Sequence, residues 1–408
     1  MTNSTKRPTH TQLMLPLLET LEEQGGAARP RDLYDAVADK LGVAPEIRDA
    51  ETRTAGGRTI KVFERHIRWA RQTAIRKGLI GAPQRGVWQL TEKGEGALQN
   101  ARPGLVLTVF ETPAGQALWA MAEDAAGHFA DDAVDLLFTS PPYPVLRGKA
   151  YGTWDSARWL DWMSDLAAEW KRILKPTGSL MVNLGTVWQP GQPVCDPYIE
   201  RFVLRLIDDL GYHLADRFYW HNPAKMPSPM PWVAIRRVRV KQSIEPVLWF
   251  AKTAHPKADN RRVLVPYQAS TLKRYIGKAG KSAKRPSGYG FGAMSFARDN
   301  GGAIPPSLIT AANSQSSDAY RNACREAGLP IHPATFPEAL PEFAIKLTTE
   351  ADDLVYDPFL GSGTTAAVAE RLGRRWIGSD RSLVYLNGAS FRFSGVRLSD
   401  PAAVDVAA

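Results

Sequence analysis

The stretch DLLFTSPPYP, residues 135–144, places groups that could do chemistry at the end of a predicted strand. Its apolar run predicts a buried strand, and Pro141 and Pro142 end that strand because neither residue can donate to a sheet ladder. Ser140 and Tyr143 therefore stand on a rigid elbow with a hydroxyl, a backbone carbonyl and an aromatic ring close together. Such an elbow could hold hydrogen-bond acceptors in fixed directions. Taken alone, the stretch is equally typical of a strand that ends in a proline loop.

A second candidate site is a glycine turn some two hundred residues later. A predicted strand over 354–356 is followed by DPFLGSGTT, in which Gly361 and Gly363 lead into a helix that begins at Thr364. Glycines there permit positive φ and let a ligand approach the free N–H groups at the start of the helix. Asp380 ends the next predicted strand, nineteen residues after Gly361, which is the spacing of a carboxylate that accepts from both hydroxyls of a ribose. The turn lacks the dinucleotide GxGxxG pattern and the lysine of a phosphate-binding loop, so it predicts a nucleoside ligand without a polyphosphate.

Alternating strands and helices from about residue 105 onward must position both sites. Strands are predicted at AVDLLFTS, GSLMVNLG, HLADRFYW, SIEPVLWFAK, LVY and RRWIG, and helices at 157–174, 197–212, 336–350 and 364–373. This alternation predicts an α/β fold with a doubly wound, mostly parallel sheet covered by helices on both faces. We interpret Trp159, Trp162 and Trp170 as core and helix-face residues, and Glu245 as a satisfied strand residue without an assigned role.

Residues 10–100 form a smaller unit of a different kind. Helices are predicted at 11–26, 30–43 and 65–80, followed by a short β-hairpin in GAPQRGVWQLTEKG. Three helices and a hairpin indicate a winged helix, and this segment resembles the N-terminal domain of Mrr-type restriction proteins. From Lys61 to Arg85 there are seven basic residues and one acidic residue. This charge is typical of a helix and wing that contact DNA, and it is equally typical of a solvated helix face, a dimerisation module or another protein contact.

The composition bounds the class of protein. The 408 residues include 51 Lys and Arg against 42 Asp and Glu, with a formal charge of +9 and a pI near 9.5, which favours an anionic partner. Cys195 and Cys324 lie far apart and the 7 histidines form no ligand-spaced cluster, so we expect no disulfide, no metal and a reducing cytoplasm. The polar start MTNSTKRPTH does not resemble a signal peptide, and no window approaches ~18 apolar residues, so no membrane partner is expected.

Three motifs in one order carry a family resemblance. TSPPY at 139–143, HPATFP at 332–337 and DPFLGSGTT at 357–365 together resemble the exocyclic-amino DNA methyltransferases, in the order of their β group. The resemblance covers roughly residues 130–390 and implies a methyltransferase sheet in permuted order that binds S-adenosyl-L-methionine (AdoMet), without a metal. The cofactor-binding residues that it implies are Asp357, Phe359, Gly361, Ser362, Gly363, Thr364, Thr365 and Asp380, with Phe336 and Pro337 closing the same pocket.

The resemblance also gives the proline elbow a catalytic role. An exocyclic amine is a poor nucleophile because its lone pair is conjugated into the ring, and acceptors on both N–H bonds draw the nitrogen toward tetrahedral geometry. The Ser140 hydroxyl and the Pro141 carbonyl are two such acceptors, Pro142 keeps them rigid, and Tyr143 offers its ring to a base swung out of the duplex. In this family a serine before the two prolines usually accompanies cytosine N4, so the expected product is N4-methylcytosine in a short site of double-stranded DNA. The nearest alternative is adenine N6, followed by a DNA-binding regulator with an inactive methyltransferase fold and by methylation of RNA or protein.

The basic segment 252–298 lies where β-group enzymes carry their target-recognition region. It has eleven Lys or Arg and one acidic residue, Asp259, with tyrosines and phenylalanines between them. Its cations suit phosphates and guanine edges, and the alternative is a solvated basic loop. The residues expected to bind DNA are Arg261, Arg262, Lys273, Arg274, Lys284 and Arg285.

These features divide the chain into five parts. They are a winged-helix-like domain (1–102), a catalytic half (103–251), a target-recognition region (252–312), an AdoMet-binding half (313–395) and a tail (396–408). Double-stranded DNA is the expected partner, with a second copy of the chain and a cognate restriction endonuclease as further candidates. The expected location is the cytoplasm, in association with the nucleoid.

Overall fold

The structure is a computed structural model that describes residues 13–40, 43–53, 57, 59–76, 78–82, 84, 86–98, 100–144, 155–189, 191–278, 283–284, 286–313 and 319–398. The chain forms two compact units, residues 1–100 and 101–408. Within the described ranges, no helix is long and apolar enough to cross a membrane.

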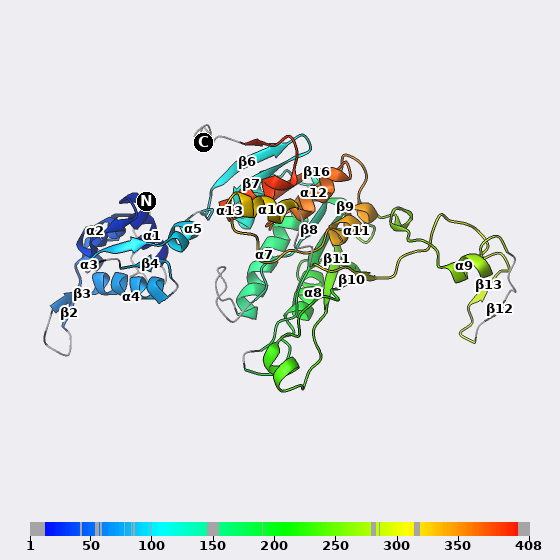
Figure 1. Cartoon of the computed structure of the whole chain (residues 1–408), viewed down its shortest axis with the longest axis horizontal. Helices are drawn as coiled ribbons and strands as arrows, with labels where there is room; N and C mark the ends of the chain where they lie inside the picture. Colours follow the sequence, from blue (N-terminus) through cyan, green and yellow to red (C-terminus); the bar gives the residue numbers. More distant parts are fainter. Residues whose placement is uncertain are drawn as a thin grey trace. The chain divides into compact units, whose positions relative to one another are not determined.

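The first unit combines helices with a three-stranded sheet (Figure 1). Its elements are α1 (Met14–Glu23), β1 (Ala27–Ala28), α2 (Pro30–Lys40), α3 (Pro45–Arg48), β2 (Glu51–Arg53), β3 (Thr59–Lys61), α4 (Val62–Arg76), β4 (Ile80–Gly81), β5 (Trp88–Leu90) and α5 (Glu92–Leu98). The hairpin β4–β5 pairs with β1 in the order β1-β5-β4. The three predicted helices and the predicted hairpin are therefore confirmed, whereas α3 and the hairpin β2–β3 have no counterpart among the expected elements.

Helix α4 shows how this unit folds. Phe63, Ile67 and Ala70 recur at the helical period and are buried. They share one core with leucines of α1 and α2 and with Trp88 of β5. The basic residues occupy the rest of the helix, and the Arg71 guanidinium lies 5.0 Å from the centroid of the Trp88 ring. Part of the positive charge of α4 is thus held against an aromatic ring.

The second unit is built on a ten-stranded sheet in the order β14-β10-β11-β9-β8-β15-β16-β7-β6-β17. The strands are β6 (Val106–Thr112), β7 (Gly115–Ala120), β8 (Val134–Thr139), β9 (Leu174–Asn183), β10 (His213–His221), β11 (Ile244–Ala251), β14 (Leu308–Thr310), β15 (Leu354–Asp357), β16 (Arg375–Asp380) and β17 (Arg397–Leu398). The central strands from β9 to β7 are parallel, and the pairs β9–β11, β11–β10, β7–β6 and β6–β17 are antiparallel. The predicted strands are confirmed, and they place β8 directly beside β15.

Helices cover both faces of this sheet (Figure 1). Helices α7 (Ser156–Ile173) and α8 (Tyr198–Asp208) share one core cluster, and α11 (Ala339–Thr348), α12 (Thr364–Arg371) and α13 (Leu383–Ala389) share another. Strand β8 separates the two clusters by its alternation, because Leu137 belongs to the first and both Leu136 and Phe138 belong to the second. The predicted doubly wound α/β fold is therefore confirmed.

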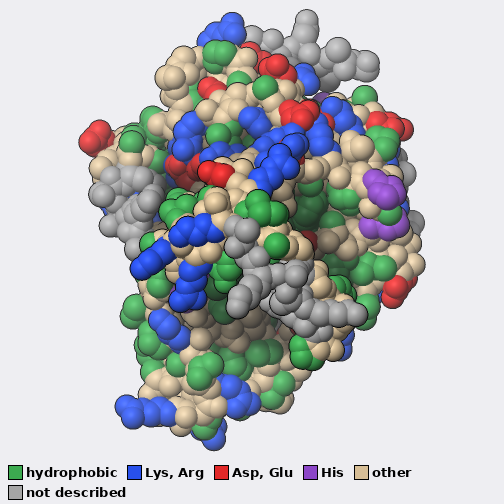
Figure 2. All heavy atoms as spheres, turned by 90° about the vertical axis from the view of Figure 1, so that its right-hand side faces the viewer, with side chains coloured by type: hydrophobic (Ala, Val, Ile, Leu, Met, Phe, Trp, Pro, Cys, Tyr) green, Lys and Arg blue, Asp and Glu red, His purple; other side chains and the backbone are tan. Residues whose placement is uncertain are grey.

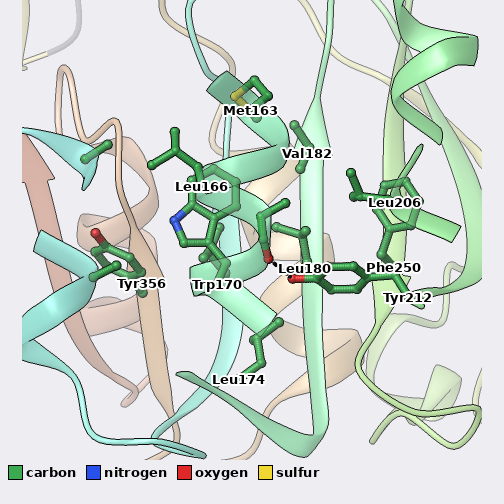
Figure 3. Packing of buried hydrophobic residues seen from close by; sticks show 14 of the residues in the cluster. Met163, Leu166, Trp170, Leu174, Leu180, Val182, Leu206, Tyr212, Phe250 and Tyr356 are labelled. Atoms are coloured by element: carbon green, nitrogen blue, oxygen red, sulfur yellow. Dashed lines mark hydrogen bonds between the residues drawn. The ribbon is translucent and has the colours of Figure 1, made fainter. Parts of the chain in front are cut away.

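The cluster beneath α7 is rich in aromatic side chains (Figure 3). Trp170 is fully buried and lies between Tyr356 on one side and Leu180 of β9 on the other (Figure 3). The Tyr212 hydroxyl donates to the carbonyl of Ala167 at 2.8 Å, which joins the chain after α8 to α7. The interpretation of Trp170 as a core residue is confirmed.

The hairpin β6–β7 is the main element of the second unit that we did not expect. Strand β7 pairs in parallel with β16, with Trp119 opposite Asp380, so the sheet continues beyond the last predicted strand. The residues that follow β7 therefore lie at the same edge as Asp380.

Candidate active site

The proline elbow and the glycine turn leave the same edge of the sheet. Strand β8 pairs in parallel with β15, with Leu137 opposite Tyr356, and β15 pairs in parallel with β16. Because parallel neighbours end at one edge, Ser140 after β8, the turn after β15 and Asp380 at the end of β16 come together.

A buried carboxyl group joins the two motifs. The Thr139 hydroxyl donates to Oδ1 of Asp357 at 2.7 Å, across 218 residues of sequence. The Thr365 hydroxyl donates to Oδ2 at 2.7 Å, and the N–H of Phe359 donates to Oδ1 at 3.1 Å. Burial raises the pKa of Asp357 to about 6, and these hydrogen bonds oppose the rise. Asp357 thus fixes the end of β8 relative to the glycine turn.

Two glycines in the left-handed region shape the turn between β15 and α12. Gly361 has a φ of +52° and Gly363 has a φ of +75°. The N–H of Gly361 donates to Oδ2 of Asp380 at 2.8 Å, and the N–H of Ser382 donates to Oδ1 at 2.8 Å. Burial raises the pKa of Asp380, while these N–H groups and the nearby His332 lower it. Each carboxylate oxygen of Asp380 keeps further acceptor capacity for a ligand.

Residues of both motifs line one cavity of about 230 Å³. The predicted residues that line it are Ser140, Pro141, Pro142, Tyr143, Phe336, Phe359, Gly361, Ser362, Thr364 and Asp380. A carboxylate at the end of a strand suits ribose hydroxyls and repels a polyphosphate, and the aromatic walls suit a flat base. The residues present therefore fit the nucleoside part of AdoMet.

Four predicted cofactor-binding residues lie outside this lining. Asp357 and Thr365 bond to each other beside the turn. Gly363 allows α13 to approach closely, because an added Cβ would lie 3.1 Å from the Cβ of Ala389. Pro337 lines a smaller neighbouring pocket that shares part of its wall with the cavity. These four residues do not line the cavity but hold or adjoin the segments that do.

Contacts from two sides and one contact within it fix the proline elbow. The Trp159 indole Nε1 donates to the carbonyl of Pro142 at 2.7 Å, so this core tryptophan of α7 also holds the elbow. The ring of Tyr143 lies against Gly185, where an added Cβ would be 2.5 Å from the ring. The hydroxyl oxygens of Ser140 and Tyr143 are 3.3 Å apart.

The cavity also has walls that the motifs do not contain. Met121, Ala122 and Glu123 follow β7, and Trp162 of α7 donates through Nε1 to Oε1 of Glu123 at 2.6 Å. Trp162 therefore lines the site, beyond the helix-face role that its spacing indicated. His332, from the HPATFP motif, also lines the cavity, and its Nδ1 lies 2.8 Å from the carbonyl of Ala334 within the same motif. The sequence signal for Glu123 is its place shortly after the apolar run that forms β7.

Two predicted DNA-binding residues make contacts within the chain. The guanidinium of Arg261 donates through Nη2 to Oδ2 of Asp259 at 2.7 Å, and that partner holds the pKa of Asp259 at about 2. Arg262 donates through Nη1 to the carbonyl of Thr349 at 2.9 Å, next to α11. Arg262 therefore anchors the start of the basic segment to the sheet domain, whereas the contact of Arg261 lies within the segment itself.

The remaining predicted DNA-binding residues lie farther along the segment. Val265 and Ala303 pair antiparallel, so the chain between them leaves and returns at one place. Lys273 and Arg274 are exposed at the end of α9 (Ala269–Arg274). This segment lies on the right-hand side of Figure 1, and Figure 2 shows the molecule from that side. Lys and Arg side chains are prominent on the face that Figure 2 shows. Outside the described residues lie the side chain of Lys284 and all of Arg285.

A second basic segment is the β10–β11 loop, residues 222–243, which extends beyond its two strands (Figure 1). It contains five Lys or Arg and no Asp or Glu. The N–H of Asn222 donates to the carbonyl of Ser243 at 2.8 Å, so the two ends of the loop are held together. Its exposed apolar side chains are Met226, Met230, Ile235, Val238 and Val240. The run without an acidic residue is the sequence signal that could have identified it.

Known proteins share both units of the chain. The family model described as DNA methylase, for N6 and N4 methyltransferases, matches residues 134–391, and the model of the Mrr N-terminal domain matches residues 10–100. The type II methyltransferase M.PvuII of Proteus hauseri is 42% identical over 281 residues, which are 68% of this chain and 83% of that protein. The type II methyltransferase M.BglII of Bacillus subtilis is 29% identical over 267 residues, 65% of each protein.

A solved structure extends this similarity to three dimensions. The PvuII DNA methyltransferase (cytosine-N4-specific) aligns with a TM-score of 0.57 and 36% sequence identity, over 69% of this chain and 87% of that chain. The region matched by the DNA methylase model contains the elbow, the glycine turn and Asp380. The chain therefore belongs to the DNA methylase family, and an Mrr N-terminal domain precedes its methylase region.

Proposed function

We propose that this chain transfers a methyl group from AdoMet to the N4 amino group of cytosine in double-stranded DNA. One observation carries the proposal: a single cavity is lined both by the Ser140 elbow and by the glycine turn with Asp380. The similarity to M.PvuII, whose solved structure is named as cytosine-N4-specific, supports cytosine over adenine. Nothing in the part of the chain that the structure describes favours adenine N6.

The glycine turn and Asp380 would hold AdoMet. The Asp380 carboxylate accepts from the ribose hydroxyls, while Phe359 and Phe336 contribute apolar walls to the same cavity. When bound, AdoMet would supply an electrophilic methyl group and leave as the neutral thioether S-adenosyl-L-homocysteine, while the methylated amine would lose one proton to solvent. The cavity would hold the acceptor base in line with the methyl group.

The elbow would activate the amine. The Ser140 hydroxyl and the Pro141 carbonyl accept hydrogen bonds from the two N–H bonds, which releases the nitrogen lone pair from conjugation. Pro142 is held in place by Trp159, so the acceptors keep their directions when the base enters. Tyr143 packs against the base, which must leave the duplex because a stacked amine is out of reach.

The DNA-binding surface would combine two segments of the second unit. Lys273 and Arg274 are exposed within the 252–312 region and suit phosphate contacts. The β10–β11 loop adds Arg236, Arg237, Arg239 and Lys241, and exposed apolar side chains among them can contact bases in an opened duplex. The first unit adds the basic helix α4 as a winged-helix contact with DNA. On the family resemblance we also propose a second copy of the chain and a cognate restriction endonuclease as partners.

Binding and transfer measurements test the proposal together. Calorimetric titration with AdoMet measures cofactor affinity, and tritium-labelled AdoMet follows transfer to duplex DNA, single-stranded DNA and RNA. We expect AdoMet binding and label in duplex DNA. AdoMet binding with label only in RNA would contradict the substrate, and a protein that binds DNA without binding AdoMet would be a regulator.

A further inference from the structure

A network of polar side chains leads from the elbow to the neighbouring strand β11. Ser140 Oγ lies 3.3 Å from the Tyr143 hydroxyl, which in turn donates to Oε2 of Glu245 at 3.3 Å. The other oxygen of Glu245 pairs with the ammonium group of Lys225. Only 12% of the Glu245 side chain is exposed, so the network is largely shielded from water. Glu245 lies 102 residues from Tyr143, so only the fold reveals their contact.

The charge of Glu245 sets the direction of the hydrogen bonds. A carboxylate can only accept, so the single proton of the Tyr143 hydroxyl is directed to Glu245. The Tyr143 oxygen then accepts, and the Ser140 hydroxyl must be its donor. With its proton committed to Tyr143, Ser140 presents only lone pairs to the cavity. That is the state which a hydrogen-bond acceptor for an amine requires.

We propose that Glu245 is a positioning residue that keeps the Ser140 hydroxyl oriented as an acceptor toward the target amine. This inference rests on the proposed function, since it assigns a cause to the acceptor role of Ser140. Without the carboxylate, Tyr143 is free to donate to Ser140, and the Ser140 proton then turns toward the incoming N–H bond, where it repels.

The burial of Tyr143 supports a fixed direction. Burial, with the charge of Glu245 as the second cause, raises the pKa of Tyr143 far above its ordinary value. The phenol therefore stays protonated throughout the pH range of any assay and always has a proton to donate. The ring is also held against Gly185, so the hydroxyl cannot swing to another partner without displacing the backbone.

Substitutions of the two partners in the Glu245–Lys225 ion pair distinguish the loss of hydrogen-bond direction from the loss of the ion pair. Glu245→Gln keeps the shape but introduces an amide that can donate as well as accept, so the direction is lost. Lys225→Gln breaks the same ion pair but leaves the Glu245 carboxylate as an acceptor. We expect Glu245→Gln to lower the single-turnover rate of methyl transfer about tenfold, and Lys225→Gln to lower it at most about threefold. The dissociation constant of AdoMet should stay within about twofold of wild type in both. Equal losses in the two variants would overturn the proposal.

A double-mutant cycle with Tyr143→Phe tests the path of the effect. Phenylalanine removes the hydroxyl that links Glu245 to Ser140, so Glu245→Gln should change the rate less than about twofold in that background. A merely structural role of Glu245 would give the same loss with and without the Tyr143 hydroxyl, which would overturn the proposal. Melting temperatures of all variants identify any loss of folding. The rate of the wild-type enzyme distinguishes a failure of this inference from a failure of the proposed function. A wild type that binds AdoMet but transfers no methyl group would overturn the proposed function. A Glu245→Gln variant as active as an active wild type would overturn only this inference.

Discussion

At the scale of single residues, the proposed function assigns cofactor binding and activation of the amine to different residues. Ser140 lies on the elbow after β8, and Asp380 closes the glycine turn through two backbone N–H groups. We expect Ser140→Ala to lower the single-turnover rate about a hundredfold, with AdoMet affinity nearly unchanged. Asp380→Ala should weaken AdoMet binding at least about tenfold, the cost of losing hydrogen bonds to a charged acceptor. Calorimetry and rapid-quench kinetics measure the two quantities, and equal loss of AdoMet binding in both variants would contradict this division.

Asp357 makes a separate prediction about pH. Its pKa is raised from 3.8 to about 6 in the folded protein, so the folded state binds the proton more tightly than the unfolded state. The stability that this provides is present below the unfolded pKa and is lost as pH rises through the folded pKa. Asp357→Asn removes the titration, so the free energy of unfolding of the variant relative to wild type should rise by about 3 kcal/mol between pH ~3 and ~7. Urea unfolding across that range measures it, and a constant difference would contradict the assignment.

At the scale of elements, the glycine after β9 is required for the elbow to pack. A Cβ at Gly185 would lie 2.5 Å from the Tyr143 ring, closer than atoms can approach. Gly185→Ala should therefore displace Tyr143 and lower the rate of methyl transfer at least about tenfold, while AdoMet affinity is retained. Gly127→Ala is the matched control, since nothing lies within 4 Å of the added Cβ. A Gly185→Ala enzyme as active as the control would show that the position of Tyr143 is unimportant.

The two basic segments make a prediction about salt. If exposed cations of α9 and of the β10–β11 loop contact phosphates, each one removed should reduce the slope of log affinity against log salt by about 0.9. Two double variants test the segments: Lys273→Gln with Arg274→Gln in α9, and Arg236→Gln with Arg237→Gln in the β10–β11 loop. The control is a third double variant on α8, Arg201→Gln with Arg205→Gln, which changes the net charge by the same amount. Fluorescence anisotropy with a short duplex measures the slopes. Identical slopes in all three variants would place the DNA elsewhere.

The periodicity of apolar residues predicted most helices and strands, because it depends only on residues that are close in the sequence. Which strand pairs with which depends on residues far apart in the sequence and was not predicted. The strands that end in the elbow and at Asp380 were found because their apolar runs stop at prolines and at an acidic residue. The strand β7 and Glu123 behind it were missed, because what makes β7 part of the site is its pairing with β16, more than 250 residues away. Glu245 was missed for the same reason: only the fold brings it to Tyr143.

At the scale of the whole molecule, one sheet unites the two halves of the methylase region. Strands β15 and β16, which follow the 252–312 region in the sequence, lie between β8 and β7, which precede it, and the hydrogen bond between Thr139 and Asp357 joins the halves at the site. The division into five parts remains a prediction, since the structure has two compact units. The first unit carries its own core and its own basic helix, and its contribution to DNA binding is part of the proposed function.

The central claim is that this sheet places the hydrogen-bond acceptors of the Ser140 elbow, which bind the N4 amine of cytosine, next to bound AdoMet. Its most direct test is nucleoside mass spectrometry of plasmid DNA that has been incubated with AdoMet and the full chain. We predict N4-methylcytosine in DNA treated with the wild type and about a hundredfold less in DNA treated with the Ser140→Ala variant. N6-methyladenine in place of N4-methylcytosine, or equal modification by the variant, would contradict the account.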